Sequence, residues 1–254
     1  MKITTWNVNS LKVRLPHVLD WLAANPVDAL GIQETKLTDD KFPLEELRAA
    51  GINAAYIGQK TYNGVAILSP HEIADVAYDM PGFDDPQKRV IAATINGVRV
   101  VNVYVPNGSE VGSEKYAYKL RWLAALRDYL ADELARHPQL AVTGDYNIAP
   151  GLEDTHDPDY WEGNILCSDA ERAAFSELLA LGLTDSFRLF EHPEKTFSWW
   201  DYRKLGFQLN KGLRIDHVLI TDALKQRCTS CEVDRAPRKL ERPSDHAPVT
   251  ASFS

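Results

Sequence analysis

The sequence has few cysteines and no long hydrophobic run. Three cysteines are an odd number, too few for a disulfide framework, and fit a reducing compartment such as the cytoplasm. Cys228 and Cys231 have CxxC spacing without the second pair of a zinc site, so we interpret them as two reduced thiols near a helix end. No apolar run approaches the roughly 20 residues that span a bilayer, and the N-terminus lacks the residue order of a signal peptide. We therefore expect a cytoplasmic protein without a membrane partner.

The chain also lacks a glycine- and serine-rich linker. Its 254 residues are 44% apolar, which is enough to bury a full core, so we expect one domain over residues 1–254. We also expect a monomer. Strands alternate with helices in two similar halves, about 1–137 and 138–254. This alternation predicts an α/β fold in which two halves pack sheet against sheet with helices outside.

Basic residues are in the minority, and the net charge of −8 argues against a polyanionic partner. The distribution of charge matters more. Residues 195–214, here called the basic ridge, carry five cations against Asp201 alone, a local net charge of +4. Residues 150–168, here called the acidic loop, carry five carboxylates and no Lys or Arg. An acidic protein with such a basic and aromatic ridge can still bind nucleic acid locally.

Hydrophobic periodicity predicts the main elements. The strongest local signal is Asn96-Gly97, which predicts a β-hairpin. Ser168 and Glu171 form a capping-box pattern at a helix start, and Gly182 ends that helix. Strands are expected at 3–8, 28–32, 65–68, 90–95, 98–103, 139–143, 213–220 and 247–253, and helices at 14–24, 44–50, 114–136 and 168–181.

Polar residues recur where these strands end: Asn7, Asn9, Glu34, Tyr104, Asp145, Asn147, Asp216, Asp245 and His246. Any one of them is accounted for by a turn, because Asn and Asp bond their own backbone. The set is different, since ligands bind at the carboxyl ends of strands and gathered carboxylates repel unless a cation lies between them. Hard oxygen ligands with a single His favour Mg²⁺ or Mn²⁺ over zinc. Such a site favours phosphate-ester hydrolysis without a covalent nucleophile.

Six segments, in this order, resemble the motifs of the exonuclease III family, the Mg²⁺-dependent DNA-repair nucleases that include the class II apurinic/apyrimidinic endonucleases. The resemblance spans essentially the whole chain. It implies the DNase I-like four-layer α/β sandwich, in which two packed β-sheets are flanked by helices. The segments are Trp6-Asn7-Val8-Asn9-Ser10-Leu11, Gln33-Glu34-Thr35-Lys36, Gly144-Asp145-Tyr146-Asn147-Ile148, Phe197-Ser198-Trp199-Trp200-Asp201-Tyr202-Arg203, Leu213-Arg214-Ile215-Asp216 and Ser244-Asp245-His246-Ala247-Pro248.

The resemblance also implies a role for each matching residue. Glu34 would be the principal metal carboxylate, with Asn7 and Asp245 completing its neighbourhood. Asp145 would align or activate the attacking water, which Asn147 would help to hold. His246 would contact the scissile phosphate, with Asp216 keeping it oriented and charged, and Tyr104 would bond the phosphate or the developing oxyanion. The sequence leaves open whether Asp145 or His246 takes the proton.

The basic ridge is expected to contact the DNA. The resemblance implies that Trp199 and Leu213 line a pocket for an abasic or terminal sugar. Arg203, Lys204, Lys211 and Arg214 would bind phosphates. Lys115, with Lys88, Arg89, Lys119 and Arg121, could extend this track. The alternatives are an amphipathic loop with core aromatics and a solvated helix face.

Two features depart from the family pattern. Ser10 stands where the family commonly has Gly, which we expect only to reshape the turn after Asn9. The acidic loop differs more, and it bears on whether an internal abasic site or only a 3′ end can enter. Incision at abasic sites, 3′-phosphatase or 3′-phosphodiesterase activity and 3′–5′ digestion of duplex ends all remain open, on double-stranded DNA with abasic sites or blocked 3′ ends.

Two other functions fit parts of the sequence. One is a phosphodiesterase or phosphatase of the same scaffold that acts on a small-molecule or lipid phosphoester. The basic ridge favours DNA over this alternative. The other is a catalytically inactive DNA-binding module, which would lack at least one of Glu34, Asp145, Asn147 or His246. All four are present.

Overall fold

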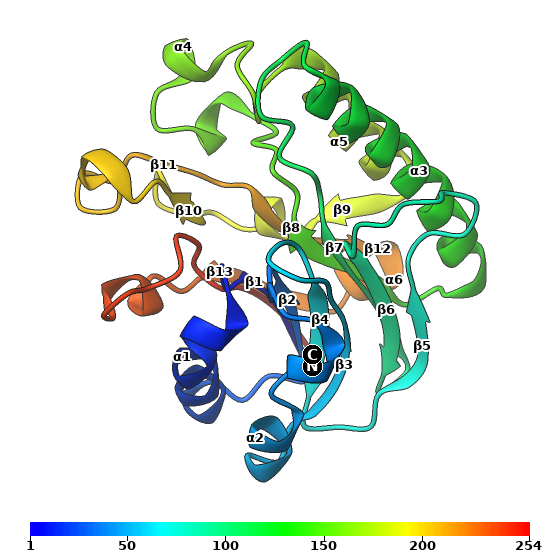
Figure 1. Cartoon of the computed structure of the whole chain (residues 1–254). Helices are drawn as coiled ribbons and strands as arrows, with labels where there is room; N and C mark the ends of the chain where they lie inside the picture. The colour runs from blue at the N-terminus through cyan, green and yellow to red at the C-terminus, as the bar shows by residue number, and fades with distance from the viewer.

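Two six-stranded mixed sheets pack face to face in the computed structural model, which describes residues 1–254 (Figure 1). The first sheet has the order β13 (Cys228–Val233), β14 (Val249–Phe253), β1 (Lys2–Asn7), β2 (Ala29–Gln33), β4 (Val65–Ser69) and β3 (Asn53–Ile57). The second has the order β5 (Ala74–Tyr78), β6 (Val90–Ile95), β7 (Val98–Tyr104), β8 (Leu140–Asp145), β12 (Asp216–Thr221) and β9 (Leu183–Asp185). A separate pair consists of β10 (Trp199–Trp200) and β11 (Gly212–Leu213).

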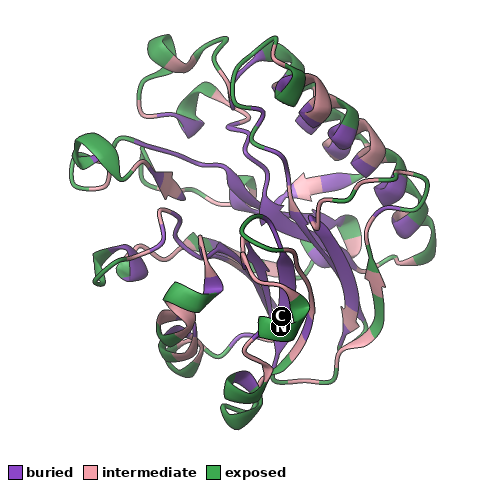
Figure 2. Ribbon diagram, in the orientation of Figure 1, coloured by how far each residue is buried: buried purple, intermediate pink, exposed green.

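Helices cover the outer faces of both sheets and complete four layers (Figure 1). The first sheet is covered by α1 (Leu11–Ala24) and α2 (Leu44–Ala49), and the second by α3 (Glu114–Arg136) and α5 (Asp169–Ala180). The remaining helices, α4 (Pro158–Trp161) and α6 (Asp222–Lys225), are single turns. One apolar cluster fills the space between the sheets, and two others lie under the outer helices. Figure 2 shows this burial concentrated in the strands. The predicted α/β sandwich is confirmed.

Most predicted elements are present, and α3 has the predicted bounds. The capping box of α5 is also confirmed, with Ser168 and Glu171 bonding each other's backbone. The predicted strand 213–220 is wrong, because β11 ends at Leu213 and β12 begins at Asp216 in a different sheet. Five strands were not predicted: β3, β5, β9, β10 and β13. Cys228 and Cys231 both lie in β13, which begins three residues after the end of α6.

The two sheets do not follow the division at residue 137. Strands β5, β6 and β7 come from the first half but pair with β8 and β12 of the second half. Conversely, β14 comes from the second half but pairs with β1 of the first half, with Thr5 opposite Val249. No helix combines the length and the apolar character that crossing a membrane requires.

Strand pairing brings the polar strand ends together. The pairs β1–β2 and β7–β8 are both parallel, so their carboxyl ends share one edge of each sheet. Tyr104 lies beside Asp145 in the β7–β8 register, and the antiparallel β12 places Asp216 opposite Asp145. Residues far apart in sequence therefore converge at one end of the sandwich.

Candidate active site

The loops after β1, β2 and β8 hold their polar residues in an unusual backbone conformation. Asn9, Glu34 and Asn147 have φ of 45°, 54° and 49°, in the left-handed region, and Ser10 has φ of 90°. Non-glycine residues are uncommon there and cluster at functional sites, where the surrounding structure must hold them. Here the backbone N–H of Ser10 donates to the carbonyl oxygen of Glu34 at 2.8 Å, which ties the first two loops together.

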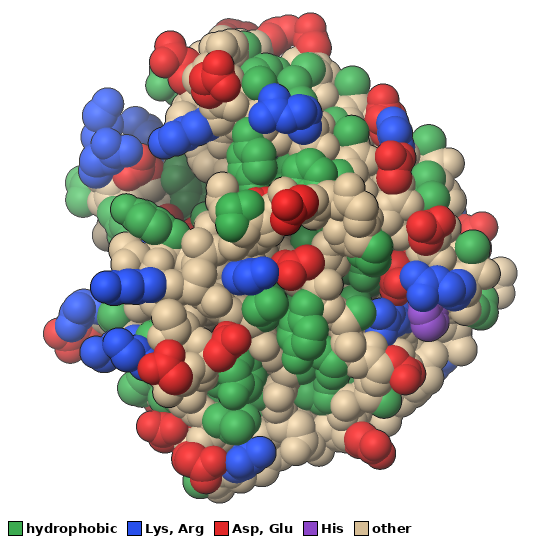
Figure 3. All heavy atoms as spheres, turned by 45° about the vertical axis from the view of Figure 1, so that its right-hand side comes forward, with side chains coloured by type: hydrophobic (Ala, Val, Ile, Leu, Met, Phe, Trp, Pro, Cys, Tyr) green, Lys and Arg blue, Asp and Glu red, His purple; other side chains and the backbone are tan.

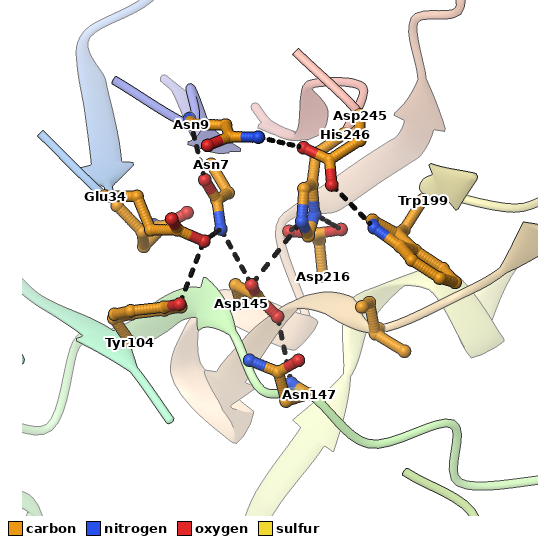
Figure 4. A network of polar contacts seen from close by, with 12 residues as sticks. Asn7, Asn9, Glu34, Tyr104, Asp145, Asn147, Trp199, Asp216, Asp245 and His246 are labelled. Carbon is orange, nitrogen blue, oxygen red and sulfur yellow. Dashed lines mark hydrogen bonds and ion pairs between the residues drawn. The ribbon is translucent and has the colours of Figure 1, made fainter. Parts of the chain in front are cut away.

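Glu34 is the centre of the first polar group (Figure 4). Its Oε1 accepts hydrogen bonds from the Asn7 amide and the Tyr104 hydroxyl, both at 2.9 Å. Its Oε2 pairs with the Lys36 ammonium at 2.8 Å. Burial opposes ionisation of this carboxyl, but Lys36 and Asn7 outweigh it and lower the pKa of Glu34. The hydroxyl of Tyr104 stays protonated, because burial and the charges of Glu34 and Asp145 raise its pKa well above the usual value.

Asp145, His246 and Asp216 form the second group, and all three are buried. Nδ1 of His246 lies 2.9 Å from Oδ2 of Asp216, and its Nε2 lies 3.6 Å from Oδ2 of Asp145. Asp145 also accepts from the Asn7 amide and from the backbone N–H of Asn147, both at 2.9 Å. The Asn7 amide thus bridges the two groups (Figure 4).

The pKa values of His246 and Asp145 are both raised, but for different reasons. Burial opposes a charge on His246, but the carboxylates of Asp216 and Asp145 outweigh it and raise its pKa. His246 is therefore a cation at neutral pH. Burial, aided by the charge of Asp216, raises the pKa of Asp145 against the opposing effects of His246 and Asn7. Asp145 is therefore a stronger base than an exposed aspartate.

Asp245 lies beside this group but forms its hydrogen bonds with other residues. Its Oδ1 accepts from the Asn9 side chain and its Oδ2 from the Trp199 indole, each at 3.0 Å. Asp245 is linked to Glu34 only indirectly, through Asn9, whose Oδ1 accepts from the Lys36 ammonium that pairs with Glu34. Its place in the metal neighbourhood stays a prediction. Backbone pairing between Trp199 and His246 brings the basic ridge against the site.

The donor set fits a hard divalent cation. Glu34 is ionised, its side chain is 17% exposed, and it lies one hydrogen bond from Asn7. Carboxylate and amide oxygens are the ligands that Mg²⁺ and Mn²⁺ prefer. Glu34 and Asn7 would hold such an ion, with Asp145 and Asp245 nearby. Asp145, Asp216 and His246 also lie close enough to form a ligand group, but the charged His246 disfavours a cation among them.

A cleft of about 520 Å³ separates the acidic loop from the basic ridge. Its walls carry Trp161 from α4, the ring of Trp199, and the exposed side chains of Arg203 and Lys204. A second groove of about 520 Å³ extends from Tyr104 to Lys115 at the start of α3. Figure 3 shows Lys and Arg side chains gathered at the left-hand edge of the face it presents. Trp199, Arg203, Lys204 and Lys115 therefore lie where they can meet a substrate.

Arg214 and Leu213 do not lie there. Arg214 is 1% exposed and pairs with Asp154 at 2.6 Å and with Asp185 at 2.8 Å, so its predicted phosphate contact is wrong. Leu213 is fully buried in an apolar cluster with Ala149 and Leu166, against which Trp199 packs. A direct contact of Leu213 with a sugar is wrong for this structure, because Leu213 presents no surface.

Two other suggested phosphate contacts, those of Lys119 and Arg89, are also corrected. Lys119 is fully buried. Lys88 pairs with Asp79 at 3.0 Å but keeps 27% of its side chain exposed, so its phosphate contact stays a prediction. Arg89 is buried with its guanidinium over the Tyr104 ring, 4.7 Å from the ring centre. Charge along a sequence does not show which side chains are turned inward by the helix or strand that carries them.

Sequence reasoning assigned no role to Lys36 and Asn107. Lys36 is part of the Gln33-Glu34-Thr35-Lys36 segment, and the need of a buried carboxylate for a cation could have indicated it. Asn107 donates to the Asn147 side chain at 3.1 Å. Its only signal was its position just beyond the strand that ends at Tyr104.

Comparisons with known proteins agree with this arrangement. The model of the endonuclease/exonuclease/phosphatase family matches residues 4–246. The chain is 36% identical to exodeoxyribonuclease III of Haemophilus influenzae, with all of both chains covered. It is similar to the structure of a Neisseria 3′-phosphatase bound to a product DNA hairpin, at 53% identity and a TM-score of 0.98, covering 100% of this chain and 99% of the other. An AP endonuclease from Archaeoglobus fulgidus is 39% identical, with a TM-score of 0.96 and the same coverage.

Proposed function

The chain belongs to the endonuclease/exonuclease/phosphatase family, and we propose that it is a metal-dependent DNA-repair phosphodiesterase. Its substrates are double-stranded DNA with abasic sites or blocked 3′ ends. The observation that carries this proposal is the Asp216–His246–Asp145 constellation, one amide away from the ionised Glu34 and beside a cleft walled by aromatic and basic side chains.

The chain's own residues divide the work of phosphodiester hydrolysis. His246, held charged by Asp216, donates to a phosphoryl oxygen and offsets the charge that develops there. Asp145 has the raised pKa of a general base and lies 3.6 Å from His246, so it can accept the proton of a water that attacks the phosphorus. His246 is a poor base because it already carries its proton at neutral pH. Tyr104, protonated, donates a further hydrogen bond to the phosphate.

We propose Mg²⁺ as the metal, with Mn²⁺ as a substitute, held by Glu34 and Asn7 near Asp245. When bound, the ion would polarise a phosphoryl oxygen and stabilise the leaving oxygen. Asn7 and Tyr104 fix the Glu34 carboxylate through hydrogen bonds to one oxygen. We further propose that residues 1–254 act as one domain and as a monomer, in the cytoplasm as the reduced cysteines favour.

Selection among substrates is assigned to the cleft. Trp199 is fixed by its bond to Asp245, so a sugar that packs on it lies next to His246. Arg203 and Lys204 bind flanking phosphates, and Trp161 of the acidic loop limits the space opposite Trp199. Because the Neisseria relative is a 3′-phosphatase and is the more similar of the two structures, we propose removal of 3′ blocking groups as the preferred reaction.

Three matched duplexes test the function, each assayed with Mg²⁺. One carries an internal abasic analogue, one a 3′-phosphate at a nick, and one an unmodified recessed 3′ end. We expect the 3′-phosphate to be removed fastest. Faster incision at the abasic analogue would overturn the preference but not the class of reaction. Release of phosphate from an inositol phosphate, with none of the duplexes cleaved, would overturn the function itself.

A further inference from the structure

A lysine and a glutamate are fully buried together between α3 and α5. Lys119 and Glu171 both have no exposed surface, and the ammonium donates to the Glu171 carboxylate. The same ammonium donates to the carbonyl oxygens of Asn147 at 2.7 Å and Asn107 at 3.1 Å. Since neither charge reaches the surface, this pair cannot contact bound DNA. The reaction described above makes no use of it.

Stability alone is a weak reason for such a pair. Removing two charges from water carries a large cost in free energy, and apolar residues of similar size often stabilise a fold equally well. Buried charges are better attested as devices that fix one arrangement of the chain. The function of the pair therefore depends on which parts of the chain Lys119 and Glu171 hold in place.

Three connections meet at this pair: two lead to the loops that follow Tyr104 and Asp145, and the third leads to the acidic loop. Asn107 follows Tyr104, and Asn147 follows Asp145. Glu171 accepts the backbone N–H groups of Leu166 at 3.0 Å and Ser168 at 3.1 Å, which end the acidic loop. The pair thus joins both catalytic loops to the loop that walls the substrate cleft.

The strained residue among these is Asn147. Its φ of 49° turns its N–H onto Oδ1 of Asp145 at 2.9 Å, while its carbonyl oxygen accepts from Lys119. Close packing fixes the aliphatic part of Lys119 as well. A Cβ on Gly108, whose φ is 90°, would lie only 3.1 Å from Cδ of Lys119. Both the position and the direction of the ammonium are therefore determined.

We propose that the Lys119–Glu171 pair is a positioning device for catalysis. It holds the Asn147 backbone so that its N–H orients the Asp145 carboxylate, and it keeps the end of the acidic loop in register with that carboxylate. Lys119 is a positioning residue, since it is fully buried and its ammonium bonds only groups of the protein. The inference rests on the proposed function, because it assigns Asp145 to the attacking water.

The test compares Lys119→Met with Lys119→Met/Glu171→Gln in the full chain, with Mg²⁺ and the 3′-phosphate duplex. Lys119→Met leaves Glu171 buried without a cation, so we expect it to lower Tm as well as activity. The double variant carries no buried charge. Its side-chain amide oxygen can still accept from the backbone N–H of Leu166, and its NH2 group can donate to the Ser168 hydroxyl in place of the bond from the Ser168 N–H. We expect its Tm to return close to that of the wild type, while kcat stays about 30-fold lower and KM changes less than about 2-fold.

Lys115→Met is the matched control. Lys115 is exposed one turn earlier on α3 and lines the groove beside Tyr104. Loss of this cation should raise KM and weaken the salt dependence of DNA binding, with a smaller effect on kcat. The double variant is expected to do the reverse, lowering kcat with little change in KM. A double variant that recovers kcat together with Tm would overturn the proposal, as would one that behaves like Lys115→Met.

Hydrogen exchange gives a readout that does not depend on activity. In the double variant, we expect the Asn147 amide to exchange at least about 10-fold faster than in the wild type, while amides in β7 and β8 stay protected. Unchanged protection of Asn147 would overturn the positioning role. A wild-type protein that cleaves none of the duplexes would instead overturn the proposed function, and Asn147 exchange would still decide whether the pair holds this loop. If Lys119→Met does not fold, the double variant alone decides.

Discussion

Asp145 has surroundings unlike those of an aspartate in water. It is 1% exposed and close to a second carboxylate, Asp216, and yet it accepts hydrogen bonds from Asn7 and Asn147. Burial keeps the pKa high, and the hydrogen bonds keep the carboxylate in one orientation. A general base needs both properties. A carboxylate of ordinary pKa is too weak a base to accept a proton from water, and a mobile carboxylate is rarely aligned with that water.

Replacement of Asp145 by Asn removes the base and keeps its shape. We expect kcat to fall by about 10³-fold, within the range of general-base catalysis, while Kd for duplex DNA changes less than about 3-fold. The loss of a nearby negative charge should also lower the pKa of His246, which NMR titration of the imidazole would measure. Near-normal turnover would remove Asp145 from its assigned role.

Ser10 affects stability more than the sequence indicated. Its φ of 90° lies in a region that only Gly occupies freely, and its side chain makes no capping bond to α1. We therefore expect Ser10→Gly to raise the free energy of unfolding by about 1 kcal/mol, after the greater freedom of Gly in the unfolded chain is deducted. Urea unfolding would measure it. A loss of stability would show that the serine backbone is not strained.

At the scale of elements, a buried ion cluster anchors the acidic loop to the second sheet. Asp154 of this loop contacts Arg214 at 2.6 Å and also Arg188, and Arg214 reaches Asp185 at the end of β9. Burial works against both carboxylates, but Arg214 outweighs it and lowers the pKa of Asp154 and of Asp185. Arg214, predicted to bind DNA, instead fixes the wall of the cleft.

This cluster predicts the acid stability of the fold. A depressed carboxyl pKa contributes stability that is present above the unfolded value of about 3.9 and is lost as the pH falls through the lower folded value. Asp154→Asn should cost about 3 kcal/mol at pH 7, because Arg214 and Arg188 lose a buried partner. Below about pH 4 its unfolding free energy should fall less steeply than that of the wild type. Parallel curves in urea titrations across this range would contradict the assignment.

The basic ridge predicts a salt effect. Arg203 is 85% exposed and pairs only with Asp201, a surface pair that a phosphate can replace. Arg203→Ala should weaken duplex binding about equally for all sequences and reduce the slope of log K against log salt by about 1. Arg127→Ala is the control, because Arg127 pairs with Asp128 and Glu177 on the outer helices and lines neither groove. Equal slopes for the two variants would place Arg203 outside the DNA track.

At the scale of the whole molecule, we expect the proposed metal to serve the chemistry and not the folding. Glu34 already has Asn7, Tyr104 and Lys36 as partners, and the core lies between and behind the sheets. We expect EDTA to abolish cleavage and Mg²⁺ or Mn²⁺ to restore it, while Tm in the chelator falls by no more than about 5 °C. Circular dichroism melts and cleavage assays on the same samples would show both. Cleavage that persists in EDTA would exclude the metal from the mechanism.

Much of the site could be predicted from the sequence because its residues sit at strand ends. Asn7, Glu34, Tyr104, Asp145 and Asp216 each end or begin a strand or directly follow one, and parallel strands bring such positions together. Prediction was wrong where the direction of a side chain mattered. Lys115 and Lys119 are four residues apart on α3, yet one is exposed and the other fully buried.

The sequence by itself determined the chemistry available: hard oxygen ligands, one histidine for the site, a basic ridge and alternating strands and helices. Residue type and local periodicity carry that information. Only the tertiary structure decided how these groups are used. The pairing of β12 with β8 sets Asp216 against Asp145, and the pairing of β14 with β1 brings the preceding His246 to the same end of the sandwich. Burial then raises the pKa of Asp145, while the two carboxylates raise that of His246. Long-range strand pairing and desolvation are properties of the fold, since they depend on residues distant in sequence.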